Sequence, residues 1–197
     1  MAATAHEKQV RKYTGAPYIE HPMRVAGRLS GFPDVTEDAV AAAWLHDVKE
    51  DQLLFWENNH SLLPPSVVQL VIWLTNTPKT GNYSVLNRSQ RKSIDNCRLS
   101  TAPYWVKVIK YLDRIDNLLE MHGAERGFKF LYFKESIDLF DALSSKAENI
   151  RLHELDHAAR ALVRTMKEDL EKEENGSRID RTSGAQPLPN PGESGQA

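Results

Sequence analysis

The chain has 197 residues, of which 41% are apolar and 26% are charged, and its formal net charge is −2. This length suffices for one domain with a sizeable core, and the composition is ordinary for a globular protein. The near balance of charge argues against broad electrostatic capture of nucleic acid or of a membrane, while leaving room for a local basic patch.

The sequence also bears on the compartment. Cys97 is the single cysteine, so no internal disulfide can form, which is typical of a reducing compartment. Residues 1–12 are polar and charged where a signal peptide needs an apolar core, and the apolar stretch 67–74 is too short to span a bilayer. We therefore expect a soluble, cytoplasmic protein without a membrane partner.

Helical periodicity runs through the first 174 residues. Short helices are expected near 2–12, 20–30, 65–76 and 86–99, and a further one in 34–46, where Asp34 and Glu37 stand at capping-box spacing. Three longer segments carry apolar stripes: Val106, Ile109, Leu112 and Ile115; Phe130, Phe133, Ile137 and Phe140; Leu155, Leu162, Val163, Met166 and Leu170. Since no run alternates as a strand does, the sequence predicts an all-α fold with a single compact multi-helix domain.

The composition changes near Asn175. From there to Ala197 the chain is rich in Gly, Ser and Pro, and Ile179 and Leu188 are its large apolar residues. Such a segment cannot bury enough surface to offset its chain entropy. We expect a domain over residues 1–174 and a disordered tail over 175–197.

The segment from His46 to Asp51 carries the strongest chemical signal. On a continuous helix His46 and Glu50 share one face, and Asp47 and Asp51 form a second such pair. Adjacent imidazole and carboxylate groups are ligands for a divalent ion. The alternative for this segment is a solvated, charged helix terminus.

Two further segments favour a metal site over that alternative. His21 lies at an expected helix start, with Pro22 suited to the first helical position. Asp113 follows an apolar run and shares a helical face with Asn117, and a buried carboxylate needs a cation. Taken singly, His21 could be a structural hydrogen-bonding residue and Asp113 the partner of a nearby Arg or Lys.

These segments together resemble the HD superfamily. The resemblance is carried by the run from Gln9 to Pro22 (QVRKYTGAPYIEHP), by HDxxED at 46–51 and by DRxxN at 113–117, and it extends from about residue 3 to 145. Within the superfamily the chain is most similar to the RelA/SpoT hydrolase domain and its stand-alone small alarmone hydrolases. The run RKxxGxPYIxHP at 11–22 is fairly specific for this guanosine polyphosphate 3′-pyrophosphohydrolase branch.

The resemblance implies a cofactor and roles for particular residues. One Mn²⁺ ion is expected, with Fe²⁺ and Co²⁺ as alternatives, and Glu50 and Asp51 are expected to act as the acid/base pair around the attacking water. Asn117 is expected to contact either the substrate or one of the residues that bind the metal. Arg11 and Lys12 are expected to hold the base and ribose. The implied metal ligands are His21, His46, Asp47 and Asp113.

The phosphate groups of a nucleotide also need positive charge. Arg88, Arg91 and Lys92 fall on one helical face, so we expect them to line the phosphate entrance; a solvated basic face is the alternative. Tyr132 or Tyr111 could stack on a purine, although aromatic residues at helical spacing are more often part of a core.

The chain departs from the family pattern at two positions beside the site. Gln52 stands where the family usually has Thr, and Asp116 stands where an aromatic residue or His is usual. An additional acid at Asp116 could repel a phosphorylated substrate, bind a second ion or face solvent.

The function expected from these residues is metal-dependent hydrolysis of a phosphorylated nucleotide. The first expectation is removal of the 3′-pyrophosphate of (p)ppGpp by a metal-activated water. The alternatives are an HD hydrolase of another nucleotide, such as the 2′-phosphate of NADPH or a modified nucleotide, a non-catalytic nucleotide sensor, and a structural helical domain. No stable nucleic-acid partner is expected, and the sequence does not indicate an oligomeric state.

Overall fold

The computed structural model describes the backbone of residues 1–145 and 149–183, and within these ranges the side chains as far as Glu173. The described chain is helical and holds no named strand, which confirms the predicted all-α class. The contacts between residues divide the chain into two units, Met1–Val163 and Arg164–Ala197.

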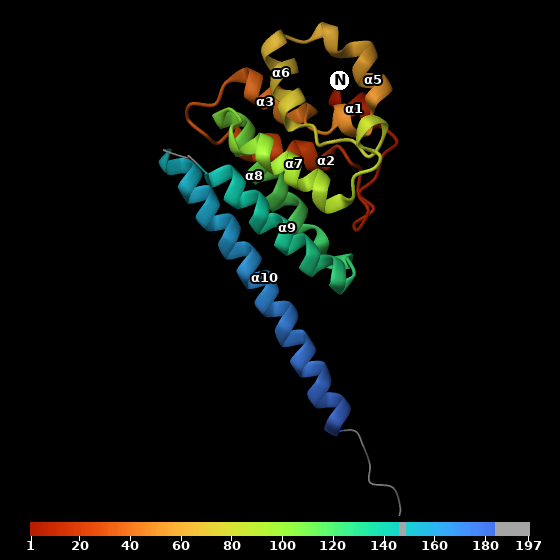
Figure 1. The fold of residues 1–197 in the computed structure, drawn as a ribbon, viewed down its shortest axis with the longest axis vertical. Coiled ribbons are helices and arrows are strands. Elements are labelled where there is room, and N and C mark those ends of the chain that lie inside the picture. The colour runs from red at the N-terminus through yellow and green to blue at the C-terminus, as the bar shows by residue number, and fades with distance from the viewer. Residues whose placement is uncertain (146–148, 184–197) are drawn as a thin grey trace, which may run out of the picture. The chain divides into compact units, whose positions relative to one another are not determined.

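Figure 1 follows the helices in chain order. Their bounds are α1 Ala2–Ala5, α2 Glu20–Leu29, α3 Glu37–Leu45, α4 Val48–Asp51, α5 Leu53–Asn59, α6 Pro65–Leu74, α7 Arg88–Ser100, α8 Tyr104–Leu119, α9 Arg126–Ser144 and α10 Ile150–Ser183. Short 3₁₀ turns cover His60–Leu62, Gly81–Tyr83 and Met121–Gly123.

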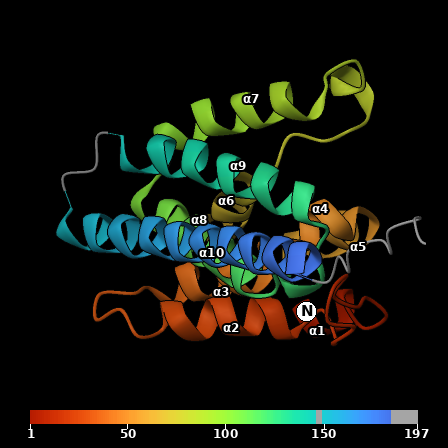
Figure 2. The same cartoon turned by 90° about the horizontal axis from the view of Figure 1, so that it is seen from below.

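Helix α8 forms the centre of the first unit. It contacts α2, α3, α6 and α9, and Figure 2 shows it between the pair α2/α3 and the pair α7/α9. Val106, Ile109 and Leu112 of its predicted apolar stripe are buried, as are Phe133 and Phe140 of α9. A helix surrounded in this way can present polar groups from its C-terminal half to several neighbours at once.

Tyr111 belongs to this core, so the prediction that it stacks on a purine is wrong. Its ring is fully buried and stacks on Phe140 with centroids 5.3 Å apart. Its hydroxyl donates to Asp156 Oδ1 at 2.8 Å. The hydrogen bond satisfies the polar end of a side chain that otherwise serves packing.

The first helix is much shorter than the predicted 2–12, because α1 ends at Ala5. Residues 10–17 instead form a tight loop: Val10 bridges Pro17, and the Arg11 amide donates to the Ala16 carbonyl at 2.8 Å. Gly15 has φ of +71°, a conformation that favours glycine. This turn fixes the direction in which Arg11 leaves the backbone.

The cap of α3 also differs from the predicted capping box. Thr36 is the N-cap, and its hydroxyl accepts a hydrogen bond from the Ala39 amide at 3.2 Å. Asp34 lies two residues earlier and accepts from Arg151 at 2.7 Å instead. The prediction placed the helix start too early because both Asp and Thr are good capping residues.

Helix α10 extends past the predicted tail boundary at residue 175, since it continues to Ser183. Residues 184–197 lie outside the described part of the chain, and the domain boundary at 174 stays a prediction. Within the described ranges, no helix combines the length and apolar character needed to cross a bilayer.

The capping assignment makes a stability prediction. Thr36→Ala removes the side-chain acceptor at the start of α3 and should lower the free energy of unfolding by about 1 kcal/mol. Asp34→Ala is the matched control and should change it by less than about 0.5 kcal/mol, since Asp34 holds a surface ion pair. Urea denaturation measures both; a larger loss in Asp34→Ala would restore Asp34 as the cap.

Candidate active site

His46 and Asp47 lie in a turn, where the sequence predicted a continuous helix. Helix α3 ends at Leu45 and α4 begins at Val48. His46 Nδ1 donates to the Ala43 carbonyl at 2.7 Å, the group that the Asp47 amide would use in a continuing helix. The predicted continuous helix is therefore wrong, and the His46 ring is buried.

His21 reaches the same place from α2, whose first residue is Glu20. Pro22 is therefore the third helical residue and not the first as predicted. Both His21 and His46 are buried. Their Nε2 atoms lie 3.2 Å apart, and Asp113 approaches from α8 with Oδ1 3.3 Å from the His21 Nε2.

Asp47 completes the set of four side chains. Its Oδ2 lies 3.2 Å from the Nε2 of His46 and 3.5 Å from that of His21. Among the described residues, ligand atoms of His21, His46 and Asp113 all lie within 4.8 Å of one another. The structure thus brings together the four residues predicted as metal ligands, from three distant stretches of chain.

Hydrogen bonds on the far side of each ring define which nitrogen faces this cluster. His21 Nδ1 lies 2.8 Å from Asp116 Oδ2, and His46 Nδ1 lies 2.7 Å from the Ala43 carbonyl oxygen. Carboxylate and carbonyl oxygens only accept, so both Nδ1 atoms carry protons. Each Nε2 therefore faces the cluster, where a proton or a metal ion can lie between the two nitrogens.

The spacing of these atoms fits a divalent ion. Ligand atoms bound about 2.1 Å from one ion at tetrahedral to octahedral angles lie roughly 3.0 to 3.4 Å apart. The measured nitrogen–nitrogen and nitrogen–oxygen distances run from 3.2 to 3.7 Å. Two imidazoles and two carboxylates also match the ligand preference of first-row divalent metals.

The electrostatics of the cluster agree with that assignment. Burial lowers the pKa of His46, but the carboxylates of Asp47 and Asp113 outweigh burial and raise this pKa to about 10. Burial tends to raise the pKa of Asp113, whereas Lys110, His21 and His46 hold it well below its usual range. The two carboxylates thus remain anionic and make the centre of the cluster favourable for positive charge.

Tyr18 supports this arrangement from the loop before α2. Its hydroxyl donates to Asp47 Oδ2 at 2.7 Å, and its ring stacks on that of His6 with centroids 4.8 Å apart. Burial, and then the charge of Asp47, raise the pKa of the Tyr18 phenol. The phenol therefore stays protonated and can keep donating to Asp47.

Glu50 and Asp51, the predicted acid/base pair, line the cavity next to the cluster. Glu50 Oε2 accepts hydrogen bonds from Asn76, from the side-chain amide at 2.7 Å and from the backbone amide at 3.3 Å. Asp51 Oδ2 accepts from Gln9 at 2.8 Å. Desolvation of the Glu50 carboxylate, and also the charge of Asp47, raise its pKa against the opposing charge of Lys110, which makes Glu50 a better proton acceptor.

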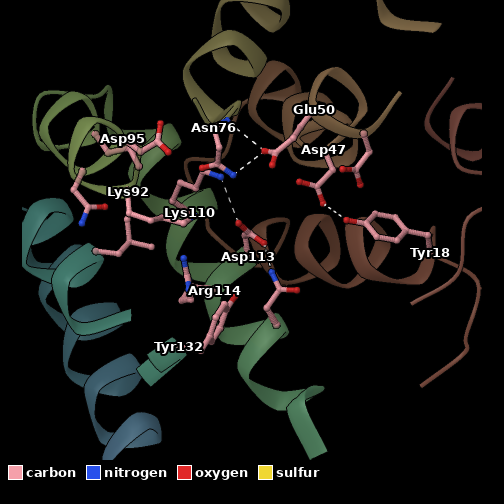
Figure 3. Close-up of a pocket in the computed structure, with 15 residues that line it drawn as sticks. Tyr18, Asp47, Glu50, Asn76, Lys92, Asp95, Lys110, Asp113, Arg114 and Tyr132 are labelled. Atoms are coloured by element: carbon pink, nitrogen blue, oxygen red, sulfur yellow. Dashed lines mark hydrogen bonds and ion pairs between the residues drawn. The ribbon is translucent and has the colours of Figure 1, made fainter. Parts of the chain in front are cut away.

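This cavity has a volume of about 150 Å³. Figure 3 shows Asp47 and Glu50 on one wall and three cations, Lys92, Lys110 and Arg114, on the other. Lys110 and Arg114 are buried on α8, and Arg114 Nη1 is a buried donor without a hydrogen-bond acceptor among the described residues. The cavity therefore places positive charge opposite the acidic pair.

Of the three basic residues predicted at the phosphate entrance, the structure places only Lys92 in this cavity. Arg88 is instead paired with Glu135 of α9 through two hydrogen bonds of 2.6 and 2.8 Å. Arg91 donates to the Leu86 carbonyl. Arg88 and Arg91 do not line this cavity, because Arg88 pairs with α9 and Arg91 with the carbonyl just before α7, and their place at the phosphate entrance stays a prediction.

A second cavity, of about 340 Å³, adjoins the first and shares Tyr18, Asn117 and Tyr132 with it. Arg11 and Lys12, the residues expected to hold a base and ribose, line this second cavity. The side-chain oxygen of Asn117 accepts from Arg11 at 2.7 Å, while its amide donates to Asp113 at 2.6 Å. Asn117 thus links the two cavities.

Aromatic rings also line the second cavity. Tyr132 lies between the two cavities with Arg114 over its ring, 4.3 Å from the centroid, and Lys12 lies over Phe128 at 5.8 Å. The aromatic rings and the Arg114 guanidinium group are flat surfaces on which a nucleobase could stack.

The structure reveals site residues that the sequence reasoning did not assign. Asp116 is buried and bonds to His21, Arg24 and Arg28, so its predicted alternatives of solvent exposure and of a second ion do not apply. Burial tends to raise the pKa of Asp116, but the bonds from His21 and the arginines hold it well below its usual range. Other additions are Tyr18, Asn76, Lys110 and Arg114.

A helical-face argument would have found part of this set. His21, Arg24 and Arg28 follow i, i+3, i+7 spacing on α2, and Asp113, Asp116 and Glu120 do so at the C-terminal end of α8. Two complementary stripes of this kind predict a charged contact between two helices.

An all-helical domain that gathers histidine and aspartate side chains beside a cationic cavity is an arrangement suited to the chemistry of the class of metal-dependent phosphohydrolases. A comparison with protein families narrows this class. The model of the HD domain matches residues 1–150, so the chain belongs to the HD domain family, whose fold implies a divalent metal.

Two relatives of the chain are named as pyrophosphohydrolases of the same nucleotide. The chain is 32% identical over 158 residues to a guanosine-3′,5′-bis(diphosphate) 3′-pyrophosphohydrolase of Drosophila melanogaster, covering 77% of this chain and 85% of the relative. It is 31% identical over 142 residues to a probable enzyme of the same name from Synechocystis, covering 72% of this chain but only 18% of that longer protein.

Two solved structures have a similar fold. A metazoan ortholog of SpoT, described as hydrolysing ppGpp, superposes with a TM-score of 0.65 at 28% identity, covering 80% of this chain and 90% of that one. A Listeria monocytogenes protein superposes with a TM-score of 0.60 at 24% identity, covering 79% and 98%, and shows likeness of fold.

The geometry predicts how the metal content depends on Asp113. Asp113→Ala removes one carboxylate from the cluster and should abolish bound divalent metal while cooperative unfolding is retained. Elemental analysis after dialysis measures the metal, and circular dichroism the fold. Asp138→Ala, an exposed carboxylate of α9, is the control and should keep the metal. Normal metal content in Asp113→Ala would contradict the proposed ligand set.

Proposed function

We propose that this chain is a metal-dependent phosphohydrolase that removes the 3′-pyrophosphate of (p)ppGpp. The observation that carries the proposal is the convergence of His21, His46, Asp47 and Asp113 beside a cavity with acids on one wall and cations on the other. The activity of the HD-domain relatives supports the choice of substrate.

His21, His46, Asp47 and Asp113 are the residues proposed to hold one ion, and we propose Mn²⁺, with Fe²⁺ or Co²⁺ as substitutes. When bound, such an ion supplies Lewis-acid activation of water and of a phosphate oxygen. The protein's contribution is to keep both Nε2 lone pairs aimed at one point, since each Nδ1 has its own acceptor.

Glu50 and Asp51 are proposed to move the proton. The water oxygen bonds to the phosphorus next to the 3′ oxygen, and the bond from that phosphorus to the 3′ oxygen breaks. Asn76 donates a hydrogen bond to Glu50, whose pKa lies above its ordinary value. Glu50 takes the proton of the water and returns it to the 3′ oxygen. The products are pyrophosphate and the nucleoside with its 5′-phosphates and a free 3′ hydroxyl.

Lys92, Lys110 and Arg114 are proposed to bind the phosphate oxygens. Lys110 and Arg114 are buried on α8, so their charges act with little screening by water. The adjoining cavity with Arg11, Lys12 and Asn117 is proposed to receive the base and ribose. The cytoplasmic location stays a prediction.

A panel of nucleotides with Mn²⁺ tests the proposal. We expect pyrophosphate release from ppGpp and pppGpp, and no orthophosphate from NADPH. Release of orthophosphate from NADPH would favour the alternative of a 2′-phosphatase, and binding without any product would favour a sensor.

Glu50→Gln is the matched variant for that assay. It should lower kcat by about 10² to 10⁴-fold because the proton acceptor is lost, while bound metal remains. Glu57→Gln makes the same chemical change on the exposed face of α5 and should leave kcat unchanged. Full activity in Glu50→Gln would remove Glu50 from the mechanism.

The pH dependence of substrate binding should report on Lys92. Burial, and then repulsion from Arg114 and Lys110, lower the pKa of Lys92 to about 8. A polyanion binds the protonated form better, so binding is strong below this pKa and weakens above it. Between pH 7 and 9 KM should rise up to about tenfold as the protonated fraction falls.

Lys92→Arg is the control for this titration, because a guanidinium stays charged over the same range. The ratio of KM in wild type to KM in Lys92→Arg isolates the effect of Lys92 from other titrations. A ratio that stays constant from pH 7 to 9 would show that Lys92 does not bind the substrate.

A further inference from the structure

Asp116 lies on α8, almost one turn after Asp113, and only 1% of its surface is exposed. Both of its oxygens are occupied. Oδ2 accepts from His21 Nδ1 at 2.8 Å and from Arg24 Nη2 at 2.8 Å; Oδ1 accepts from Arg24 Nε at 2.9 Å and from Arg28 Nη1 at 2.5 Å. A buried carboxylate is thus shared between one imidazole and two guanidinium groups.

The position of the carboxylate relative to its partners is informative. The Arg24 and Arg28 side chains are 30% and 37% exposed, so an ion pair between the helices could form nearer the surface. The carboxylate lies further in, directly behind the buried ring of His21. Removing the Asp116 carboxylate from water costs free energy. Its burial behind His21 therefore suggests that the contact with the imidazole has a function.

The same carboxylate begins a chain of hydrogen bonds that leads to Asp113. Arg24 joins Asp116 to Glu120, and Glu120 accepts from Arg11 Nε at 2.5 Å. Arg11 then donates to Asn117, and Asn117 to Asp113, whose Oδ1 lies 3.3 Å from His21 Nε2. His21 and Asp113 are therefore held from behind by one connected set of side chains.

We propose that Asp116 is a positioning residue that holds the His21 ring with Nδ1 protonated and Nε2 directed at the metal cluster. This inference rests on the proposed metal site, and it goes beyond it by assigning a function to a position where the family pattern has an aromatic residue or His. A carboxylate behind a ligating imidazole fixes the tautomer and makes the imidazole a stronger ligand.

The competing explanation is that Asp116 only pairs α2 with α8. Arg28→Gln separates the two explanations, since it removes one guanidinium from Asp116 without touching His21. A packing role predicts similar consequences for Asp116→Asn and Arg28→Gln. A positioning role predicts that only Asp116→Asn weakens metal binding, because its amide cannot accept from His21 and both arginines at once.

Titration of the metal-free proteins with Mn²⁺ is the experiment. We expect the affinity of Asp116→Asn for Mn²⁺ to fall about 10- to 100-fold, and that of Arg28→Gln to stay close to wild type. Turnover of Asp116→Asn should recover as Mn²⁺ is raised. Wild-type affinity in Asp116→Asn, or an equal loss in Arg28→Gln, would overturn the inference.

A spectroscopic measurement on the unaltered protein keeps the test valid if Asp116→Asn does not fold. In the protein loaded with diamagnetic Zn²⁺, ¹⁵N NMR of the His21 ring should show a protonated, slowly exchanging Nδ1. A ring protonated at Nε2 would contradict the proposal. Failure of the metal site itself is distinguished by Asp113→Ala, whose retention of metal would refute the site whatever Asp116 does.

Discussion

Two imidazole nitrogens that point at one another across 3.2 Å, inside a helical domain, constrain the rest of the structure. With each Nδ1 already donating, both Nε2 atoms face the space between the rings, which favours a proton or a metal ion there. Asp47 and Asp113 supply the matching negative charge from α4's start and from α8. The turn between α3 and α4 and the central position of α8 both serve this convergence.

The same constraint organises the cavity. Anionic groups have to stay near the cluster, yet a phosphorylated substrate has to approach it. Figure 3 shows Asp47 and Glu50 on one wall, and Lys110 and Arg114 on the other, beside Asp113. Because Arg114 and Lys110 flank Asp113 on one helix, a single element carries both a proposed metal ligand and the cations for phosphate.

Much of this could be predicted from the sequence. Helical periodicity predicted the all-α class, and the resemblance to the HD superfamily implied His21, His46, Asp47 and Asp113 as metal ligands. Local competition for hydrogen bonds was harder to predict: His46 takes the Ala43 carbonyl and breaks the helix, and Thr36 instead of Asp34 caps α3. Arg88 and Arg91 shared a helical face with Lys92, but periodicity does not reveal that Glu135 and the Leu86 carbonyl lie within reach.

Asp116 illustrates the limit most clearly. As a departure from the family pattern it could be noticed from the sequence, but its meaning depended on Arg24 and Arg28, which lie about 90 residues earlier. Its charge is acceptable only because α2 carries two cations on the face that meets α8. Helical periodicity in one sequence shows which residues are neighbours along the same helix. It does not show that charges on a second helix neutralise a buried acid.

The chain of hydrogen bonds from Asp116 through Arg24, Glu120, Arg11 and Asn117 to Asp113 has a consequence for evolution. Loss of the arginines would leave the buried Asp116 carboxylate without compensation, which costs more than losing the acid and its cations together. Substitutions of Asp116 and of its arginines should therefore occur together among related chains. A lineage that replaces Asp116 by a neutral side chain should also have lost the positive charge at Arg24 or Arg28.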